Sequence, residues 1–94
     1  MYEVKKGTQS FYIGEAEDQW SATITYVYSG ENRITVEHTY VSEALNGQGV
    51  GKLLLKALTD WARAENLKIT PECSYAKAQM EKNSEYHDLI FEEA

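Results

Sequence analysis

The chain of 94 residues contains a single cysteine and no long apolar run. One thiol excludes an internal disulfide bond, and nothing else in the composition points to an oxidising compartment. No stretch approaches the roughly 20 apolar residues that span a bilayer, and the first six residues lack the apolar core of a signal peptide. These absences predict a cytoplasmic protein without a membrane partner.

Positive charge is also scarce: 9 Lys and Arg face 15 Asp and Glu, for a formal net charge of −6. A nucleic-acid partner would require a basic face, so we expect none. The acidic balance suits a cationic substrate such as an amine, although a surface that only keeps the protein soluble is the plainer interpretation. The two histidines and the cysteine lack the spacing of metal ligands, which predicts no metal site.

The length predicts one domain, residues 1–94, of the α+β class. Residues 10–13, 20–28 and 33–41 have the composition or the period-2 alternation of strands, and turn residues separate them. They predict an antiparallel meander of three strands. In the third strand the alternation puts Ile34, Val36, His38 and Tyr40 on one face.

A long amphipathic helix follows this meander. Its apolar stripe is predicted to be core, and so are both tryptophans, Trp20 and Trp61. The stripe consists of Val50, Leu53, Leu54, Ala57, Leu58, Trp61 and Ala62. Asn66 is a plausible left-handed stop. Residues 67–73 are expected to form a short strand, which Pro71 leaves unpaired on one side. Ser74 is expected to cap a helix over residues 74–82, with Ala76 and Met80 pointing inward. Residues 86–91 are expected to form a last turn or helix. The order is β-β-β-α-β-α, with one parallel βαβ crossover.

Three glycines at alternate positions, Gly47, Gly49 and Gly51, lie between the third strand and the long helix. Such a loop exposes N–H groups at the positive end of a helix dipole, where phosphate or pyrophosphate binds. The P-loop pattern fails because Asn46 replaces its first glycine and Leu53 its hydroxyl residue. The dinucleotide-binding pattern G-x-G-x-x-G fails on the spacing of the glycines.

The run Asn46-x-x-Gly49-x-Gly51 resembles the (Gln/Arg)-x-x-Gly-x-(Gly/Ala) signature of the GNAT acetyltransferase superfamily. Further segments resemble its minimal single-domain branch of small N-acetyltransferases, namely those that contain His38, Val41, Gln48, Lys68, Pro71, Cys73, Tyr75 and Tyr86. Two residues depart from the pattern: Asn46 replaces Arg or Gln, and Tyr40 stands where the branch often has Glu.

This resemblance implies that the cofactor is acetyl-coenzyme A (acetyl-CoA) and that the crossover strands splay apart around its pantetheine arm. The cofactor-binding residues it implies are Val41, Asn46, Gly47, Gln48, Gly49, Val50, Gly51, Lys52 and Tyr75. Tyr75 or Tyr86 is a candidate proton donor to the leaving thiolate.

Two residues are candidates for catalysis. Cys73 is either a small buried hydrophobe or a reactive thiol at a helix start. His38 is either a satisfied strand histidine or the base that takes a proton from the acceptor.

The predicted function is transfer of acetyl from acetyl-CoA to an amine, carried by a small molecule or a protein. The alternatives are a non-catalytic acyl-CoA-binding module and, more weakly, a plain α+β interaction domain. A monomer or a weak homodimer is expected.

Overall fold

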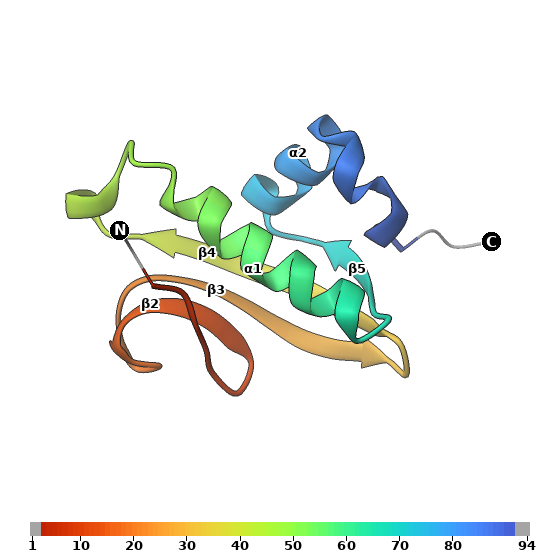
Figure 1. Ribbon diagram of the computed structural model, residues 1–94, viewed down its shortest axis with the longest axis horizontal. Helices are drawn as coiled ribbons and strands as arrows, with labels where there is room; N and C mark the ends of the chain where they lie inside the picture. Colours follow the sequence, from red (N-terminus) through yellow and green to blue (C-terminus); the bar gives the residue numbers. More distant parts are fainter. Residues whose placement is uncertain (1–2, 92–94) are drawn as a thin grey trace.

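A computed structural model describes residues 3–91 of the chain. Three longer strands, a helix, a short strand and a second helix follow one another in the predicted order (Figure 1). The strands are β1 (Lys5–Lys6), β2 (Ser10–Ala16), β3 (Gln19–Gly30), β4 (Arg33–Val41) and β5 (Lys68–Pro71). The helices are α1 (Val50–Ala64) and α2 (Ser74–Lys82), with 3₁₀ turns η1 (Glu43–Leu45) and η2 (Ser84–Leu89).

The strands form one sheet in the order β1-β2-β3-β4-β5. All neighbours are antiparallel except β4 and β5, so both the meander and the parallel crossover are confirmed. Two details differ from expectation. Strand β1 has only two residues, too few for an alternating pattern, and β2 continues past Gly14 to Ala16 through an irregular register. Gly14 permits this because its φ is +151° and a Cβ there would stand 2.5 Å from the Gln19 carbonyl oxygen.

Strand β4 contains a bulge that the alternation did not reveal. Tyr26 of β3 pairs with Val36, but the preceding Thr25 pairs with His38, so Glu37 is an extra residue. One extra residue moves every later side chain to the other face of the sheet. The prediction that His38 and Tyr40 share a face with Ile34 and Val36 is therefore wrong: Ile34 and Val36 are in the core, whereas His38 and Tyr40 are exposed.

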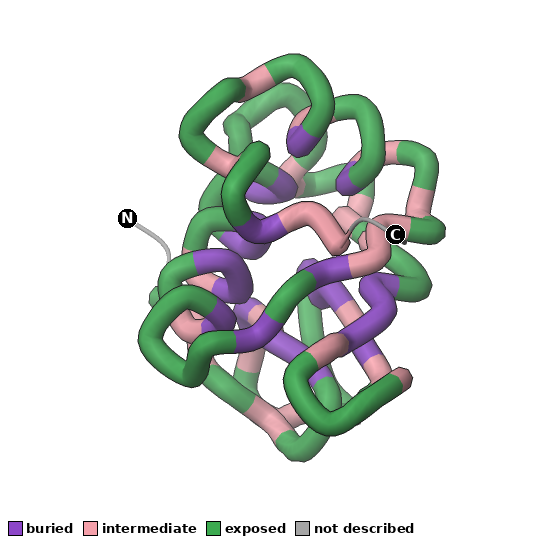
Figure 2. Tube along the Cα trace, turned by 90° about the vertical axis from the view of Figure 1, so that its right-hand side faces the viewer, coloured by how far each residue is buried: buried purple, intermediate pink, exposed green. Residues whose placement is uncertain are grey.

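Helix α1 covers one face of the sheet, which we call the inner face (Figure 1). Buried positions gather between the sheet and the helices (Figure 2). The helix begins at Val50, and Asn66 after its end is left-handed with φ +58°, as predicted.

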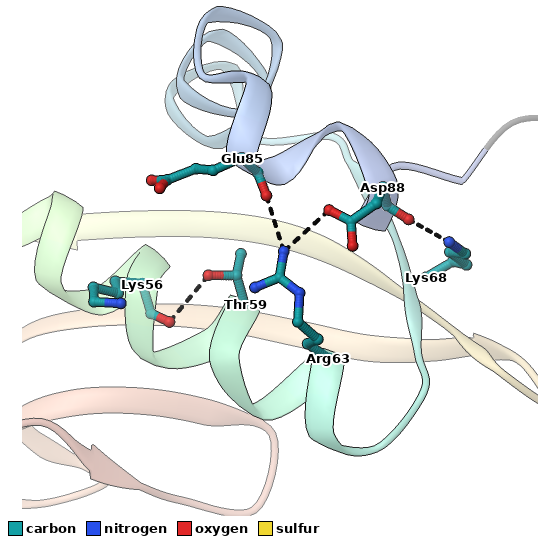
Figure 3. A network of polar contacts seen from close by, with 6 residues as sticks. All are labelled: Lys56, Thr59, Arg63, Lys68, Glu85 and Asp88. Carbon is teal, nitrogen blue, oxygen red and sulfur yellow. Dashed lines mark hydrogen bonds and ion pairs between the residues drawn. The ribbon is translucent and has the colours of Figure 1, made fainter.

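The predicted core was partly wrong. Leu53 and Trp20 are 41% and 40% exposed, while Leu55 and Thr59 of α1 are buried. Helix α1 is covered on a second side, because η2 lies against it and Arg63 holds it there. Its guanidinium donates to the Glu85 carbonyl oxygen (2.9 Å) and to the Asp88 carboxylate (3.0 Å), as Figure 3 shows.

The segment after α1 follows the prediction with small changes. Pro71 lies in β5, the last strand of the sheet, and within residues 3–91 its outer edge meets only an isolated bridge between Ile69 and Ile90, away from Pro71. Helix α2 buries Ala76 and Met80 as expected, but its N-cap is Cys73, not Ser74, and no side chain caps it. The last turn, η2, begins two residues earlier than predicted.

Candidate functional site

The loop between β4 and α1 depends on glycine at two positions. Gly47 and Gly49 have φ of +80° and +73°, in the left-handed region, and Gly49 is the N-cap of α1. A residue with a Cβ would be strained at either position, by about 1–2 kcal/mol. A Cβ would meet no atom within 4 Å at either glycine, so both face open space.

Gly51 is required for a different reason, namely close packing. It lies in the first turn of α1 and is buried, and a Cβ there would stand 2.9 Å from Cζ and Oη of Tyr75. The Tyr75 ring of α2 therefore rests directly on the α1 backbone. Two segments far apart in the sequence meet here.

The first turn of α1 presents backbone donors. Leu53 N donates to the Gly49 carbonyl oxygen (3.2 Å) and is the first N–H to bond within the helix. The N–H groups of Val50, Gly51 and Lys52 have no acceptor inside the helix, and the helix dipole adds positive potential at this end. Anionic oxygens are the groups that such a turn binds.

These elements surround a cleft of about 390 Å³, which we call the inner cleft. All predicted cofactor residues except Gln48 line it: Val41, Asn46, Gly47, Gly49, Val50, Gly51, Lys52 and Tyr75. The Gln48 side chain instead donates to the Ala44 carbonyl oxygen (3.2 Å).

The inner cleft opens beside a gap between β4 and β5. The parallel register ends at Val36 and Pro71, and the Val36 carbonyl oxygen accepts from the N–H groups of Glu72 (3.0 Å) and Cys73 (3.1 Å). Beyond this point the chain turns into α2, and within residues 3–91 no strand pairs with this edge of residues 37–41. The predicted splay of the two strands is thus confirmed.

Cys73 lies at this gap. It is half-buried, and its Sγ donates to Oγ1 of Thr39 (3.3 Å), which itself lines the inner cleft. Sequence reasoning found Cys73 but missed Thr39, because only the bulge turns Thr39 inward. It also missed Gln79, although a lining residue one helical turn after Tyr75 was a readable signal.

His38 is not brought to the inner cleft. It lies on the other face of β4, exposed, with its ring stacked on Tyr40 at 5.6 Å between centroids. The two candidate catalytic residues therefore flank β4 from opposite sides.

Two phenols lie at or near the cleft. Burial is the largest cause that raises the pKa of Tyr75, and the charges of Tyr86 and Cys73 act in the same direction. Burial likewise raises the pKa of Tyr86, followed by the charge of Glu85. Both phenols keep their protons at neutral pH, which is the form that can donate one.

No group of three His, Cys, Asp or Glu side chains among residues 3–91 is arranged to hold a metal ion. None of the helices in the same range has the length and apolar character needed to cross a bilayer.

Comparison with known proteins identifies the family to which this chain belongs. The solution NMR structure of a GCN5-like protein from Staphylococcus aureus superposes with a TM-score of 0.81 at 46% sequence identity, over 99% of this chain and 91% of that one. The fold also matches a ribosomal-protein-alanine N-acetyltransferase from Brucella melitensis, at 17% identity and a TM-score of 0.58 over 82% of this chain and 64% of that one.

Sequence relatives agree with the structural ones. Protein NATD1 of Xenopus tropicalis is 34% identical over 62 residues, which cover 66% of this chain but 57% of NATD1. The matched segment thus spans little more than half the length of this relative. The profile of the GCN5-related N-acetyltransferases matches residues 10–89. The resemblance seen in the glycine loop extends to the whole fold, and the chain belongs to the GCN5-related N-acetyltransferase family.

Proposed function

We infer that this protein transfers an acetyl group from acetyl-CoA to an amine. The observation that carries the proposal is the inner cleft, where the N–H groups of the first turn of α1 open onto the gap between β4 and β5. In the proposal, the N–H groups of α1 bind an anion, and the gap between β4 and β5 beside them admits an extended chain. Membership of the family supports the same reaction.

The residues present fit the cofactor. In the proposal, the N–H groups of Val50, Gly51 and Lys52 and the open glycines bind the pyrophosphate, and the unpaired edge at Val41 bonds the pantetheine amides as a neighbouring strand would. Gly51 and Tyr75 form one wall of the inner cleft. Asn46 adds a side-chain amide in place of the larger Arg or Gln of the family pattern.

Acetyl-CoA supplies the acetyl group as an activated thioester. The acceptor amine attacks only in its neutral form, so a base has to take one proton, and His38 is the proposed base. The departing thiolate needs a proton, which the Tyr75 phenol is suited to give. In this direct version Cys73 only lines the site.

A two-step version differs in the role of Cys73. The Cys73 sulfur forms a bond to the acetyl carbon while the bond from that carbon to the coenzyme sulfur breaks, and the proton of the Cys73 thiol ends on the coenzyme sulfur. The amine then takes the acetyl group from Cys73 and loses a proton to the base. The contact between Sγ and Thr39 at the edge of the cleft supports a position near the thioester for Cys73 in both versions.

Calorimetry with acetyl-CoA tests binding, and release of free thiol during an amine screen tests turnover. Intact mass after incubation with acetyl-CoA alone separates the two versions. A gain of about 42 Da that is lost in Cys73→Ala supports the two-step version, whereas full turnover by Cys73→Ala without an adduct supports the direct one.

A second candidate function is a non-catalytic acyl-CoA-binding module. The observation in its favour is the position of His38, on the opposite face of β4 from the cleft. Tight binding of acetyl-CoA without turnover of any amine would favour this module. No binding at all would contradict both candidates.

A further inference from the structure

The outer face of the sheet, opposite α1, has a pocket of its own. It has a volume of about 400 Å³ and crosses three strands, from Ser10 in β2 through Thr23 and Thr25 in β3 to Tyr40 in β4. Register confirms the face: Thr23 pairs with Tyr40, while the next pair, Ile24 with Thr39, points inward. We call this the outer pocket.

Aromatic rings form one wall of the outer pocket. Trp20 and Tyr40 stack with their centroids 5.8 Å apart and an angle of 20° between their planes, and they are 40% and 49% exposed. Few large apolar side chains of residues 3–91 are so exposed, and these two stand together. Exposed ring faces attract cations, particularly ammonium groups.

Carboxylates occupy both ends of the outer pocket. Glu37 is the bulge residue of β4, and Glu17 lies at the opposite end, beside the β2 side of the sheet. Oε2 of Glu17 accepts from Thr8 N (2.7 Å), Gln9 N (3.3 Å) and Ser10 Oγ (2.8 Å), which orients the group. The hydrogen bond from Ser10 is the largest cause that lowers the pKa of Glu17, so this carboxylate is charged at neutral pH.

The floor of the outer pocket has an unsatisfied hydroxyl group. Oγ1 of Thr25 is buried and has no hydrogen-bond partner in the part of the chain that the structure describes. A buried hydroxyl usually has a partner, and a polar ligand or water in the outer pocket would supply one. Adjacent strands are about 4.8 Å apart, so Ser10 of β2, which binds the Glu17 carboxylate, and Glu37 of β4 lie in strands that are on the order of 10 Å apart.

The β4 end of this pocket meets the gap between β4 and β5. Val36 is the last β4 residue bonded to the β5 segment, and Glu37 follows it directly. Cys73 and Thr39 stand at the same gap on the inner side. Glu37, which lines the outer pocket, therefore adjoins the start of this gap from the outer side.

We propose that the outer pocket binds the acceptor and that this acceptor is a linear aliphatic diamine. This inference rests on the proposed acetyl transfer. One ammonium group pairs with Glu17, the methylene chain lies along Trp20 and Tyr40, and the second nitrogen is at Glu37, where the gap leads to the thioester. The net charge of −6 favours such a dication over an anionic acceptor.

The test compares 1,4-diaminobutane with 1-aminobutane, which lacks the second charge. We expect the diamine to bind to the free protein, and to show a KM at least about tenfold lower than the monoamine in the transfer assay. Trp20→Ala and Glu17→Gln each raise the KM for the diamine by roughly tenfold. The matched control is Glu31→Gln, an exposed carboxylate in the turn between β3 and β4, which leaves the KM unchanged.

Trp20→Ala tests the outer pocket without touching the hydrogen bonds of Glu17, so a folding defect of Glu17→Gln does not decide the outcome. Equal KM values for the two amines, or unchanged KM in both variants, would overturn the diamine proposal. Calorimetry with acetyl-CoA runs in parallel on the same samples. If the diamine proposal fails but acetyl-CoA still binds, the proposed acetyl transfer is not contradicted. If acetyl-CoA does not bind, the acetyl transfer itself is contradicted.

Discussion

Strand β4 separates two surfaces of different construction. The inner cleft consists largely of backbone groups and small residues from one continuous loop, residues 46–52, together with Tyr75. The outer pocket consists of aromatic and carboxylate side chains from three strands and the turns beside them. The first suits a ligand recognised through its phosphates and amides, and the second a ligand recognised through charge and ring contacts.

The difference also concerns how each surface is encoded. A loop that works through backbone N–H groups depends on local conformation, which glycine sets directly. A pocket made of side chains from β2, β3 and β4 depends on strand register, and one extra residue reorders it. Mutations should therefore affect the two surfaces separately, which the following predictions use.

The largest effect is expected for Gly49→Val. Gly49 has φ +73°, and a Cβ there faces open space at the inner cleft. A valine would be strained in this conformation and would block the approach of a phosphate to the helix start. We expect calorimetry to show at least about a hundredfold loss of acetyl-CoA affinity in a protein that remains folded by circular dichroism.

The matched control is Gly30→Ala, at the end of β3, where a Cβ would make only an ordinary contact with Arg33 at 3.6 Å. It should keep the affinity of the wild type. A folded Gly49→Val variant with unchanged affinity would show that the cofactor does not bind at this loop.

A smaller effect is expected on the other face, for His38→Ala. If His38 takes the proton of the acceptor, kcat falls about 100-fold while acetyl-CoA affinity stays the same, because the ring lies across β4 from the inner cleft. His87→Ala is the matched control, since this exposed imidazole contacts the Glu81 carbonyl oxygen (2.9 Å) far along the chain. Equal kcat in both variants would remove His38 from the mechanism.

The same contrast explains which parts of the molecule were predictable from sequence. The start of α1 at Val50 and the left-handed Asn66 depend on short segments with strong local signals, and both were predicted. The gap before Cys73 was implied by the family resemblance, and Pro71 was consistent with it. The family resemblance added the cofactor, which no periodicity could name.

What sequence reasoning missed depends on distant contacts. The bulge at Glu37 arises in the pairing of β3 with β4, and no local pattern marks it, so His38 and Tyr40 were assigned to the wrong face. Leu53 was placed in the core because its spacing fits the stripe, but the cover from η2 shifts burial toward Leu55. The outer pocket went unnoticed for the same reason.

The smallest effect is an acid-dependent one at the far end of the outer pocket. The pKa of Glu17 is lowered in the folded state, chiefly by the Ser10 hydroxyl and also by the N–H groups of Gln9 and Thr8. A carboxyl with a depressed folded pKa stabilises the fold above its unfolded pKa, ordinarily 4.5, and loses that contribution as the pH falls through the folded value. Glu17→Gln should therefore lower Tm by a few degrees at about pH 7, and the difference from the wild type should shrink toward about pH 3. Ser10→Ala, which removes only the largest cause, should show the same trend with a smaller amplitude. Thermal unfolding at both pH values measures this. A Tm difference that stays constant between them would mean that the carboxylate charge contributes nothing, and that Glu17 holds the turn at Thr8 by its shape alone.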